Sequence, residues 1–308
     1  MQSTTPTILI TGASGKVSSA IIRYFNQETD YRLLLVASRE FPLPKGISEE
    51  RNIQCIIPHG EFNTIREVAQ KYNPEFIINT VAMTDVDGCE INRQLAQELN
   101  VKSVENYARL ARICSSHLIQ LSTDYIFDGA KGPYTETDTP NPICYYGKTK
   151  LAGENICKSA TIPYTILRTN VVYGIAPGMK PDFIQWVLKM CDVKEPFKVV
   201  DDQFSNPTII DDIALAIGRI ITKKRTGIYN IGGADYINRL EMAKTIARHF
   251  KKDADLIYPM KTSDLKQVAK RPLRGGLITL KASTDLSFAP TSLESGLQII
   301  QKQMKDLM

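Results

Sequence analysis

The stretch TILITGASGKVSSAIIRYF, residues 7–25, determines how the rest of the chain is interpreted. Its first four residues are apolar or β-branched, which is typical of a buried strand, and a glycine turn follows. From Val17 onward, apolar or small side chains recur at the spacing of one helix face. A strand, a glycine turn and a helix in this order predict a pyrophosphate site, because the helix N-terminus offers unpaired N–H groups. Gly12 and Gly15 would also suit a tight structural turn.

Further short apolar runs resemble buried strands, and amphipathic stretches lie between them. The six expected strands cover residues 7–10, 33–37, 53–57, 76–79, 117–121 and 164–167. Helices are expected near residues 17–25, 65–72, 94–114 and 146–158. Continuous apolar strands that alternate with amphipathic helices predict an α/β fold with a doubly wound parallel sheet, the Rossmann arrangement.

The alternation changes after about Tyr173. Residues 174–181 are rich in glycine and proline and predict a loop, and short strands and helices follow it. Asn238 and Glu241 form a capping-box pair that predicts a helix start, and a terminal helix is expected from near Ser292. We therefore expect a cofactor-binding Rossmann domain at 1–172 and a smaller α+β substrate-binding lobe mainly at 173–308. A return of the chain to the sheet between residues 199 and 231 stays open.

The composition argues against several other classes of protein. The formal net charge of +5 is mild, and the longest basic run, residues 223–225, fits a solvated face better than a nucleic-acid patch. The six cysteines include no C-x-x-C pair and the three histidines do not cluster near them, so we expect neither a metal site nor a disulfide framework. No basic-then-apolar leader and no apolar run of about 18 residues is present, which predicts a cytoplasmic protein without membrane contact.

The second expected strand ends in Ala37-Ser38-Arg39. An acidic residue about 20 residues after the glycines would bind the ribose 2′-hydroxyl of NAD, and none stands there. Ser38 can donate a hydrogen bond and Arg39 can pair with a 2′-phosphate. The pattern favours NADPH over NADH, although NADH stays open and Arg39 could be an ordinary surface residue.

Tyr146 and Lys150 form a Y-x-x-x-K pattern. In a chain with 13 tyrosines, one such match is expected by chance. The context adds weight, because the pattern opens an expected helix, where positions i and i+4 share a face. Upstream, a strand runs directly into Ser122-Thr123-Asp124, at the strand end where such folds bind ligands. A buried tyrosine, a solvated lysine and a strand-end threonine would be the purely structural alternative.

The chemistry of ketone reduction requires these three residue types. Addition of a hydride to a ketone creates an alkoxide that needs a proton, and a tyrosine with a pKa near 10 is a poor acid–base group unaided. A lysine ammonium one helical turn away would lower the pKa of the tyrosine. A hydroxyl such as that of Thr123 can hold the carbonyl oxygen. Tyr146, Lys150 and Thr123 are therefore the candidate catalytic residues.

These residues resemble the extended short-chain dehydrogenase/reductase family and, within it, the dTDP-4-dehydrorhamnose reductase group. The resemblance covers nearly the whole chain, and its part from Ser122 to Glu154 is specific to this group. The matching segments are 122–129 (STDYIFDG), 132–136 (GPYTE), 146–154 (YGKTKLAGE), 168–174 (RTNVVYG), 200–203 (VDDQ), Pro207-Thr208 and Arg271-Pro272.

The resemblance implies NADPH-dependent reduction of a nucleotide-linked 4-keto-6-deoxy sugar. Tyr146 would then be the proton donor, Lys150 its partner and Thr123 the carbonyl-binding hydroxyl. The implied cofactor contacts are Gly12, Ser14, Gly15, Lys16, Val17, Ser38, Arg39, Val81, Ala82, Thr84, Tyr146, Lys150 and Asn170. The implied substrate contacts are Thr123, Asp124, Asp87, Gln203 and Arg271, and Glu90 lies in the same matching segment as Asp87.

The chain departs from the family pattern at several positions. Ser18 replaces the third loop glycine, Pro58-His59-Gly60 replaces an acidic motif, and Val171 stands where the family often has Trp. The motif RPxNS reads Arg271-Pro272-Leu273-Arg274-Gly275. Three functions therefore stay open: this reductase, another nucleotide-sugar reductase or epimerase, and a non-catalytic NADP-binding regulatory subunit. A homodimer is compatible with each of them.

Overall fold

The computed structural model describes residues 6–47, 49–176 and 181–307. Its centre is a parallel sheet of seven strands in the order β11-β6-β5-β4-β1-β2-β3. The predicted doubly wound parallel sheet is therefore confirmed. The order reverses between β1 and β4, and at such a point a crevice opens at the carboxyl ends of the strands. The strands are β1 (Thr7–Thr11), β2 (Arg32–Ala37), β3 (Asn52–Ile56), β4 (Phe76–Asn79), β5 (His117–Thr123), β6 (Tyr164–Thr169) and β11 (Gly227–Asn230).

Alternate side chains of each strand enter opposite layers of the core. Ile8 and Ile10 of β1 join one buried cluster, whereas Leu9 joins the other. Both faces of the sheet are thus apolar, which explains why the strands are continuous apolar runs. One face is covered by α1 (Lys16–Glu28), α8 (Ile210–Thr222) and α10 (Leu280–Leu286), and the other by α2 (Phe62–Tyr72), α5 (Ser103–Cys114) and α6 (Tyr145–Ser159).

The chain leaves the sheet after β6 and comes back to it much later. Helix α8 packs against α1, and β11 then pairs in parallel with β6, with Ile228 opposite Ile166. One outermost strand of the sheet and two of its covering helices, α8 and α10, therefore come from the C-terminal half of the sequence.

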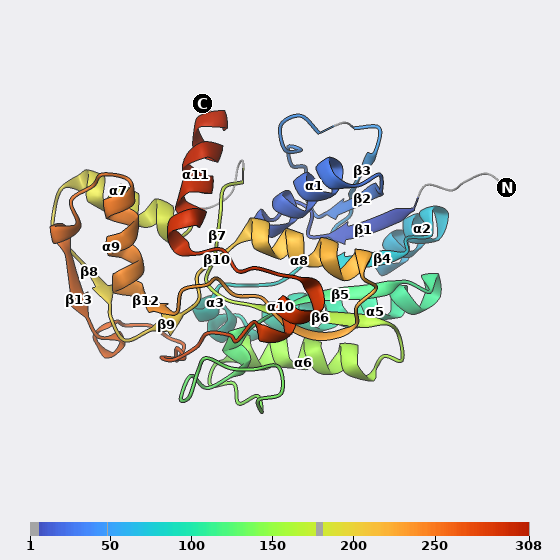
Figure 1. The fold of residues 1–308 in the computed structure, drawn as a ribbon. Coiled ribbons are helices and arrows are strands. Elements are labelled where there is room, and N and C mark those ends of the chain that lie inside the picture. Colours follow the sequence, from blue (N-terminus) through green and yellow to red (C-terminus); the bar gives the residue numbers. More distant parts are fainter. Residues whose placement is uncertain (1–5, 48, 177–180, 308) are drawn as a thin grey trace.

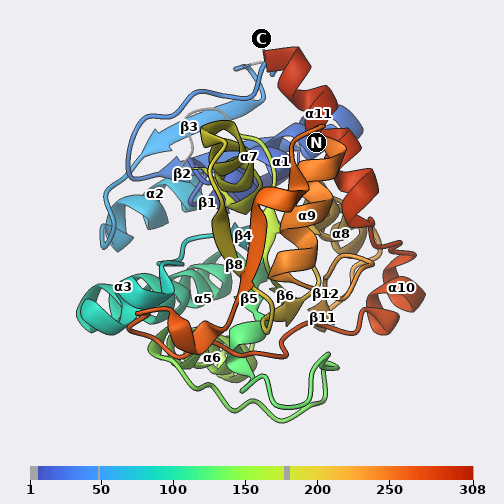
Figure 2. The same cartoon turned by 90° about the vertical axis from the view of Figure 1, so that its left-hand side faces the viewer.

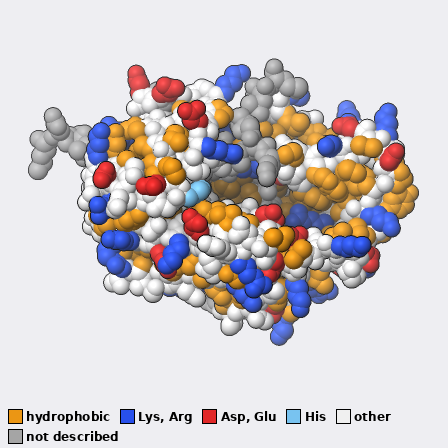
Figure 3. All heavy atoms as spheres, turned by 180° about the vertical axis from the view of Figure 1, so that it is seen from behind, with side chains coloured by type: hydrophobic (Ala, Val, Ile, Leu, Met, Phe, Trp, Pro, Cys, Tyr) orange, Lys and Arg blue, Asp and Glu red, His pale blue; other side chains and the backbone are white. Residues whose placement is uncertain are grey.

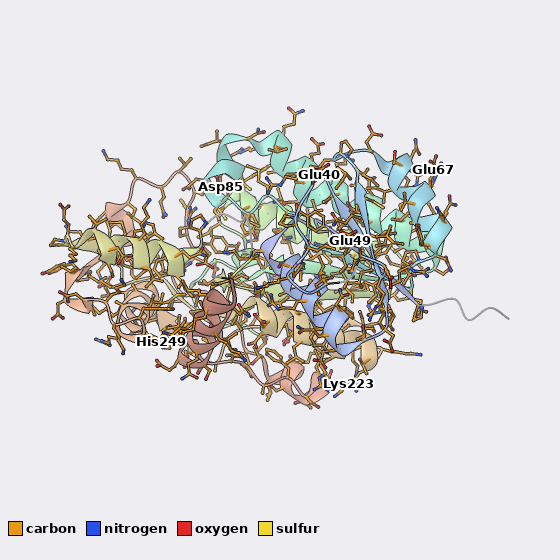
Figure 4. All side chains as sticks on the ribbon, turned by 90° about the horizontal axis from the view of Figure 1, so that it is seen from above. Glu40, Glu49, Glu67, Asp85, Lys223 and His249 are labelled. Carbon is orange, nitrogen blue, oxygen red and sulfur yellow. The ribbon has the colours of Figure 1, made fainter. Side chains whose placement is uncertain are left out.

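The remaining C-terminal segments build a smaller part beside the sheet, at the left in Figure 1 and in front of it in Figure 2. Its own buried cluster joins helices α7, α9 and α11 to strands β8 and β13. In Figure 4, Glu40 and Glu67 mark the sheet part and His249 marks this smaller part. Its elements are α7 (Phe183–Val193), β8 (Phe197–Val200), α9 (Arg239–His249), η3 (Ala254–Leu256), β13 (Ile257–Met260), η4 (Thr262–Asp264) and α11 (Leu293–Leu307).

Two pairs of short strands connect the two parts. They are β7 (Val172–Tyr173) with β10 (Thr208–Ile209) and β9 (Phe204–Ser205) with β12 (Ile237–Asn238). Asn238 caps α9 in a capping box with Glu241, as predicted. Residues 177–180 of the predicted 174–181 loop lie outside the described residues.

The structure differs from the sequence prediction before β5. The single helix expected at 94–114 is split into α4 (Arg93–Gln97), a π-helical turn η1 (Glu98–Lys102) and α5, and α3 (Val86–Ile91) precedes them. The π turn buries Asn100, whose side chain bonds Met83 and the Thr149 hydroxyl of α6. The π turn is only five residues long, and the sequence analysis did not predict it. Among the described helices, none combines the length and apolarity needed to cross a bilayer.

Candidate functional site

The glycine turn after β1 forms the base of a cavity at the crevice. Gly12 has a φ of +67°, a conformation that favours glycine, and Gly15 precedes α1 without any side-chain cap. The first turn of α1 carries no acidic residue, so its free N–H groups are available to an anion. Ser18, which departs from the family pattern, is fully buried and donates its hydroxyl to the Gly12 carbonyl at 3.0 Å. The Ser18 side chain therefore stabilises the glycine turn in place of the third glycine that the family usually has.

A cavity of about 280 Å³ extends from this turn past the end of β2. It lies beside the hollow visible near the middle of the molecule in Figure 3. Seven of the implied cofactor contacts line it: Gly12, Ser14, Gly15, Ser38, Arg39, Val81 and Ala82. Residues that the sequence analysis did not assign to the cofactor complete the wall, among them His59, Phe62, Lys102 and Asn106.

Four other implied cofactor contacts are placed differently. Lys16 forms a salt bridge with Asp182 of the C-terminal part at 2.8 Å, and Val17 packs against the core. Thr84 is exposed outside the cavity wall. Asn170 is buried, where it donates to Asp124 at 3.2 Å and accepts from the Thr208 hydroxyl. None of the four lines this cavity, and the Lys16 salt bridge instead joins α1 to the C-terminal part.

Tyr146 and Lys150 lie on α6, which packs closely against the turn after β5. A Cβ on Gly147 would meet the carbonyl oxygen of Tyr125 at 2.1 Å, so only glycine allows this approach. The Tyr146 phenol consequently lies near the Thr123 hydroxyl, which acts to lower its pKa, and its ring lies 5.6 Å from that of Tyr125. Lys150 donates from Nζ to the carbonyl oxygen of Leu121 at 2.8 Å. The structure thus brings the three candidate catalytic residues together.

Burial is the main cause of the shifts in the pKa values of Tyr146 and Lys150. Burial raises the pKa of the Tyr146 phenol, and the hydrogen bond with Thr123 opposes this rise. Burial also lowers the pKa of Lys150 to about 8, while the Glu154 carboxylate acts in the opposite direction. The Lys150 ammonium is turned to the carbonyl oxygen of Leu121, so its expected lowering of the Tyr146 pKa stays a prediction.

The implied substrate residues form two groups. Asp124 is buried and accepts hydrogen bonds from the Thr123 hydroxyl, the Asn170 amide and the Gly276 N–H, and burial raises its pKa. Asp124 thereby connects the turn after β5 to the C-terminal segment that contains Gly276. Asp87 and Arg271 form a salt bridge at 3.0 Å, next to the cluster that contains Tyr146.

A second cavity, of about 530 Å³, borders this region and is bounded by Arg271, Asp128, Ile143 and the segment after β13. Gln203 lies nearby and donates to the Thr262 hydroxyl at 3.0 Å. Within the described ranges, no three His, Cys, Asp or Glu side chains are grouped so that they could hold a metal ion.

The sequence analysis missed a buried ion pair that positions α6. Glu154 accepts two hydrogen bonds from Arg168 of β6 and one from the Ser122 hydroxyl at 2.7 Å. Glu154 and Arg168 both lie in the matched segments, but nothing in their spacing shows that they pair. Asn100 was missed for the same reason, because its partners are distant in the sequence.

Comparison with known proteins identifies the family. The model of the RmlD substrate binding domain matches residues 6–305 of the chain. The chain belongs to the RmlD family. One relative of this RmlD protein is the dTDP-4-dehydrorhamnose reductase of Aggregatibacter actinomycetemcomitans, 27% identical over 306 residues, which are 96% of this chain and 98% of the relative.

Another relative is methionine adenosyltransferase 2 subunit beta of Bos taurus. It is 27% identical over 286 residues, which are 91% of this chain and 80% of the relative. Among solved structures, the dTDP-4-dehydrorhamnose reductase of Bacillus anthracis in complex with NADP matches with a TM-score of 0.86 and 25% identity, over 97% of this chain and 99% of that one. The relatives of the chain thus include both a reductase and a subunit of another enzyme.

Proposed function

We propose that this RmlD-family protein reduces a nucleotide-linked 4-keto-6-deoxy sugar with NADPH. The observation that carries the proposal is the meeting of Tyr146, Lys150 and Thr123 at the carboxyl end of β5, the same edge of the parallel sheet at which the glycine turn follows β1. The relatives named dTDP-4-dehydrorhamnose reductase support the same reaction. We further propose that the protein works in the cytoplasm, where its free thiols stay reduced, and that it forms a homodimer.

The residues around the first cavity fit a phosphorylated dinucleotide. The uncapped N-terminus of α1 and the positive φ of Gly12 suit a pyrophosphate that approaches the backbone. Arg39 and Lys102 lie in the same wall and supply cations for a 2′-phosphate, and no acidic residue follows β2 directly. NADPH, when bound there, supplies the hydride for the carbonyl carbon.

Residues of the chain bind the carbonyl oxygen and donate the proton. Thr123 holds the carbonyl oxygen by a hydrogen bond, and Tyr146 gives that oxygen its phenolic proton as the carbonyl becomes an alcohol. Because burial raises the pKa of Tyr146, the phenol is protonated at neutral pH, as a reduction requires. Lys150 holds a positive charge near the tyrosinate that remains, which regains its proton from solvent.

The test is turnover by the purified protein. Loss of NADPH absorbance should accompany conversion of one member of a panel of nucleotide-linked 4-keto sugars, with the alcohol product identified by mass. Conversion of the keto sugar to an epimer that keeps its carbonyl group, without net NADPH loss, would instead indicate an epimerase.

The relationship to methionine adenosyltransferase 2 subunit beta favours one second candidate, a regulatory subunit that binds NADP without turnover. Tight binding of NADPH with no oxidation across the panel would support that candidate and exclude the reductase. A change in the activity of a co-purified enzyme would then be the next measurement.

A further inference from the structure

The N-terminus of α6 has no cap of its own, although it carries the candidate proton donor. Helix α6 begins at Tyr145, and Tyr146 is its second residue. In the described part of the chain, the side chain of the N-cap residue Cys144 forms no capping hydrogen bond, and the first turn of α6 contains no acidic residue. The first N–H groups of a helix have no partners within the helix, so another element or water must supply their acceptors.

Glu90 of α3 supplies the acceptor for one of these groups. Its Oε1 accepts from the backbone N–H of Tyr145 at 2.7 Å, across 55 residues of sequence. The Glu90 side chain is only 16% exposed, and this hydrogen bond is the main cause that lowers the pKa of its carboxyl group. Glu90 is therefore ionised at neutral pH, and a carboxylate at this end of a helix also interacts favourably with the helix dipole.

Two side chains of α4 hold this contact in place. Nη2 of Arg93 donates to Oε2 of Glu90 at 2.9 Å, and the guanidinium carbon of Arg93 lies 4.8 Å from the centre of the Tyr145 ring. Nε2 of Gln97 donates to the Tyr145 hydroxyl at 3.0 Å. Both oxygens of Glu90 are thus bonded, which orients its carboxylate toward α6.

An ordinary surface ion pair lacks this geometry. Lys102 and Glu105 are also three residues apart and lie 2.8 Å from each other, but their side chains are 70% and 44% exposed. Within the described residues, Glu105 accepts only from Lys102. Glu90 differs because it is largely buried and because one of its oxygens serves the backbone of another helix.

The contact lies next to the residue on which the proposed reaction depends. Tyr146 follows Tyr145 directly, and a Cβ on the next residue, Gly147, would meet the Tyr125 carbonyl oxygen at 2.1 Å. The first turn of α6 thus contacts α3 through Glu90 and the turn after β5 through Gly147. A displacement of about 1 Å from the productive geometry can cost about 10²-fold in rate, so the position of this turn affects proton transfer.

We propose that Glu90 is a positioning residue, which caps α6 from α3 and thereby sets the position of Tyr146 relative to Thr123. Glu90 acts through the Tyr145 N–H and touches neither the sugar nor the cofactor in this role. The assignment rests on the proposed function for the reaction that Tyr146 performs, whereas the capping contact does not depend on it.

Hydrogen exchange tests the capping contact without any turnover. The Tyr145 amide, followed by NMR in the full-length protein, should exchange about 10-fold faster or more in Glu90→Ala than in the wild type, because its charged acceptor is lost. Glu90→Gln should keep most of the protection, since its amide oxygen can still accept. Equal exchange rates in Glu90→Ala and the wild type would overturn the proposal.

Steady-state kinetics test the positioning role. Glu90→Ala should lower kcat by about 10- to 100-fold, whereas the KM for the sugar and the affinity for NADPH should change little. Glu90→Gln should restore most of kcat, because it keeps an acceptor on a side chain of the same length. A purely structural role would lower the stability of Glu90→Ala and leave kcat of the folded enzyme unchanged, and this result would overturn the positioning role.

Asp85 provides a matched control at the other end of α3, and it is labelled in Figure 4. It is exposed and caps α3 by accepting from the Gly88 N–H at 3.0 Å. Asp85→Ala should weaken α3 without removing the contact with Tyr145, so its kcat should equal that of the wild type. Thermal unfolding shows that each variant is folded at the assay temperature. Equal losses of kcat in Asp85→Ala and Glu90→Ala would overturn the specific role of Glu90.

The two measurements separate this proposal from the proposed function. A wild type that reduces no keto sugar, but whose Tyr145 amide loses protection in Glu90→Ala, would overturn the proposed function and support the capping contact. A wild type that reduces a keto sugar, with unchanged kcat in Glu90→Ala, would overturn the positioning role alone.

Discussion

Glu154 of α6 and Arg168 of β6 form a bidentate ion pair that joins this helix to the sheet. Nε of Arg168 donates to Oε1 of Glu154 at 2.9 Å, and Nη2 donates to Oε2 at 2.8 Å. Both side chains are almost completely buried. Arg168 also donates to the Glu136 carbonyl oxygen, so one guanidinium connects α6, β6 and the loop after β5.

We predict that Glu154→Gln destabilises the protein by roughly 3–5 kcal/mol, because it leaves the Arg168 guanidinium buried without its counter-charge. The free energy of unfolding in urea measures the loss. The double variant Glu154→Leu with Arg168→Met should recover much of it, because neither charge is then left alone. A Glu154→Gln variant as stable as the wild type would contradict this account.

Replacement of Tyr146 by Phe removes the proposed proton donor and keeps the ring. We expect kcat to fall by about 10²- to 10⁴-fold, whereas the affinity for NADPH should change little. Steady-state kinetics and NADPH titration measure the two quantities. Tyr145→Phe is the control, because Tyr145 is the neighbouring residue and its hydroxyl accepts a hydrogen bond from the Gln97 side chain. Equal activity of the two variants would remove Tyr146 from the mechanism.

Arg39→Asp should reverse the choice of cofactor. The wild type should bind NADPH about 10- to 150-fold more tightly than NADH, the range of a charge-assisted contact. In the variant, the carboxylate repels a 2′-phosphate and can accept from a 2′-hydroxyl. Titration with both cofactors gives the ratio, and Arg248→Asp is the control for net charge. Equal affinities of the wild type for both cofactors would refute the prediction.

His117 should make the protein sensitive to mild acid. Burial lowers the pKa of His117 to about 4 from 6.5. Between these values the unfolded chain binds a proton that the folded chain does not, so stability falls as the pH decreases. The full effect is roughly 3 kcal/mol. The free energy of unfolding should differ less between pH 7 and pH 4.5 in His117→Gln than in the wild type. His59 is exposed, so His59→Gln should show the same difference as the wild type.

The six cysteines should differ in reactivity although all are free thiols. Only Cys55 is partly exposed, and burial raises the pKa of Cys157 to about 12 and of Cys89 to about 11. A thiol reagent should therefore modify Cys55 first in the native protein and all six in denaturant. Fewer than six thiols in denatured, non-reduced protein would indicate a disulfide.

The sequence predicted the features that depend on local pattern. The apolar runs located β1 to β6 within one or two residues, because strands buried on both faces are short and continuous. The candidate catalytic residues were found because Tyr146 and Lys150 share a helix face and Thr123 ends a strand.

Features that join distant segments could not be predicted in this way. The Glu154–Arg168 pair and the burial of Asn100 depend on how α6 meets β6 and the π turn.

The late return of the chain to the sheet makes the two parts inseparable. A fragment that ended at Tyr173 would expose the edge of β6 to water and remove α8 from the apolar face of α1. Such an edge pairs readily with other chains, so the fragment should aggregate rather than bind cofactor. A circular permutant with its new termini in an exposed loop would keep every strand, including β11. We therefore expect it to fold where the fragment does not.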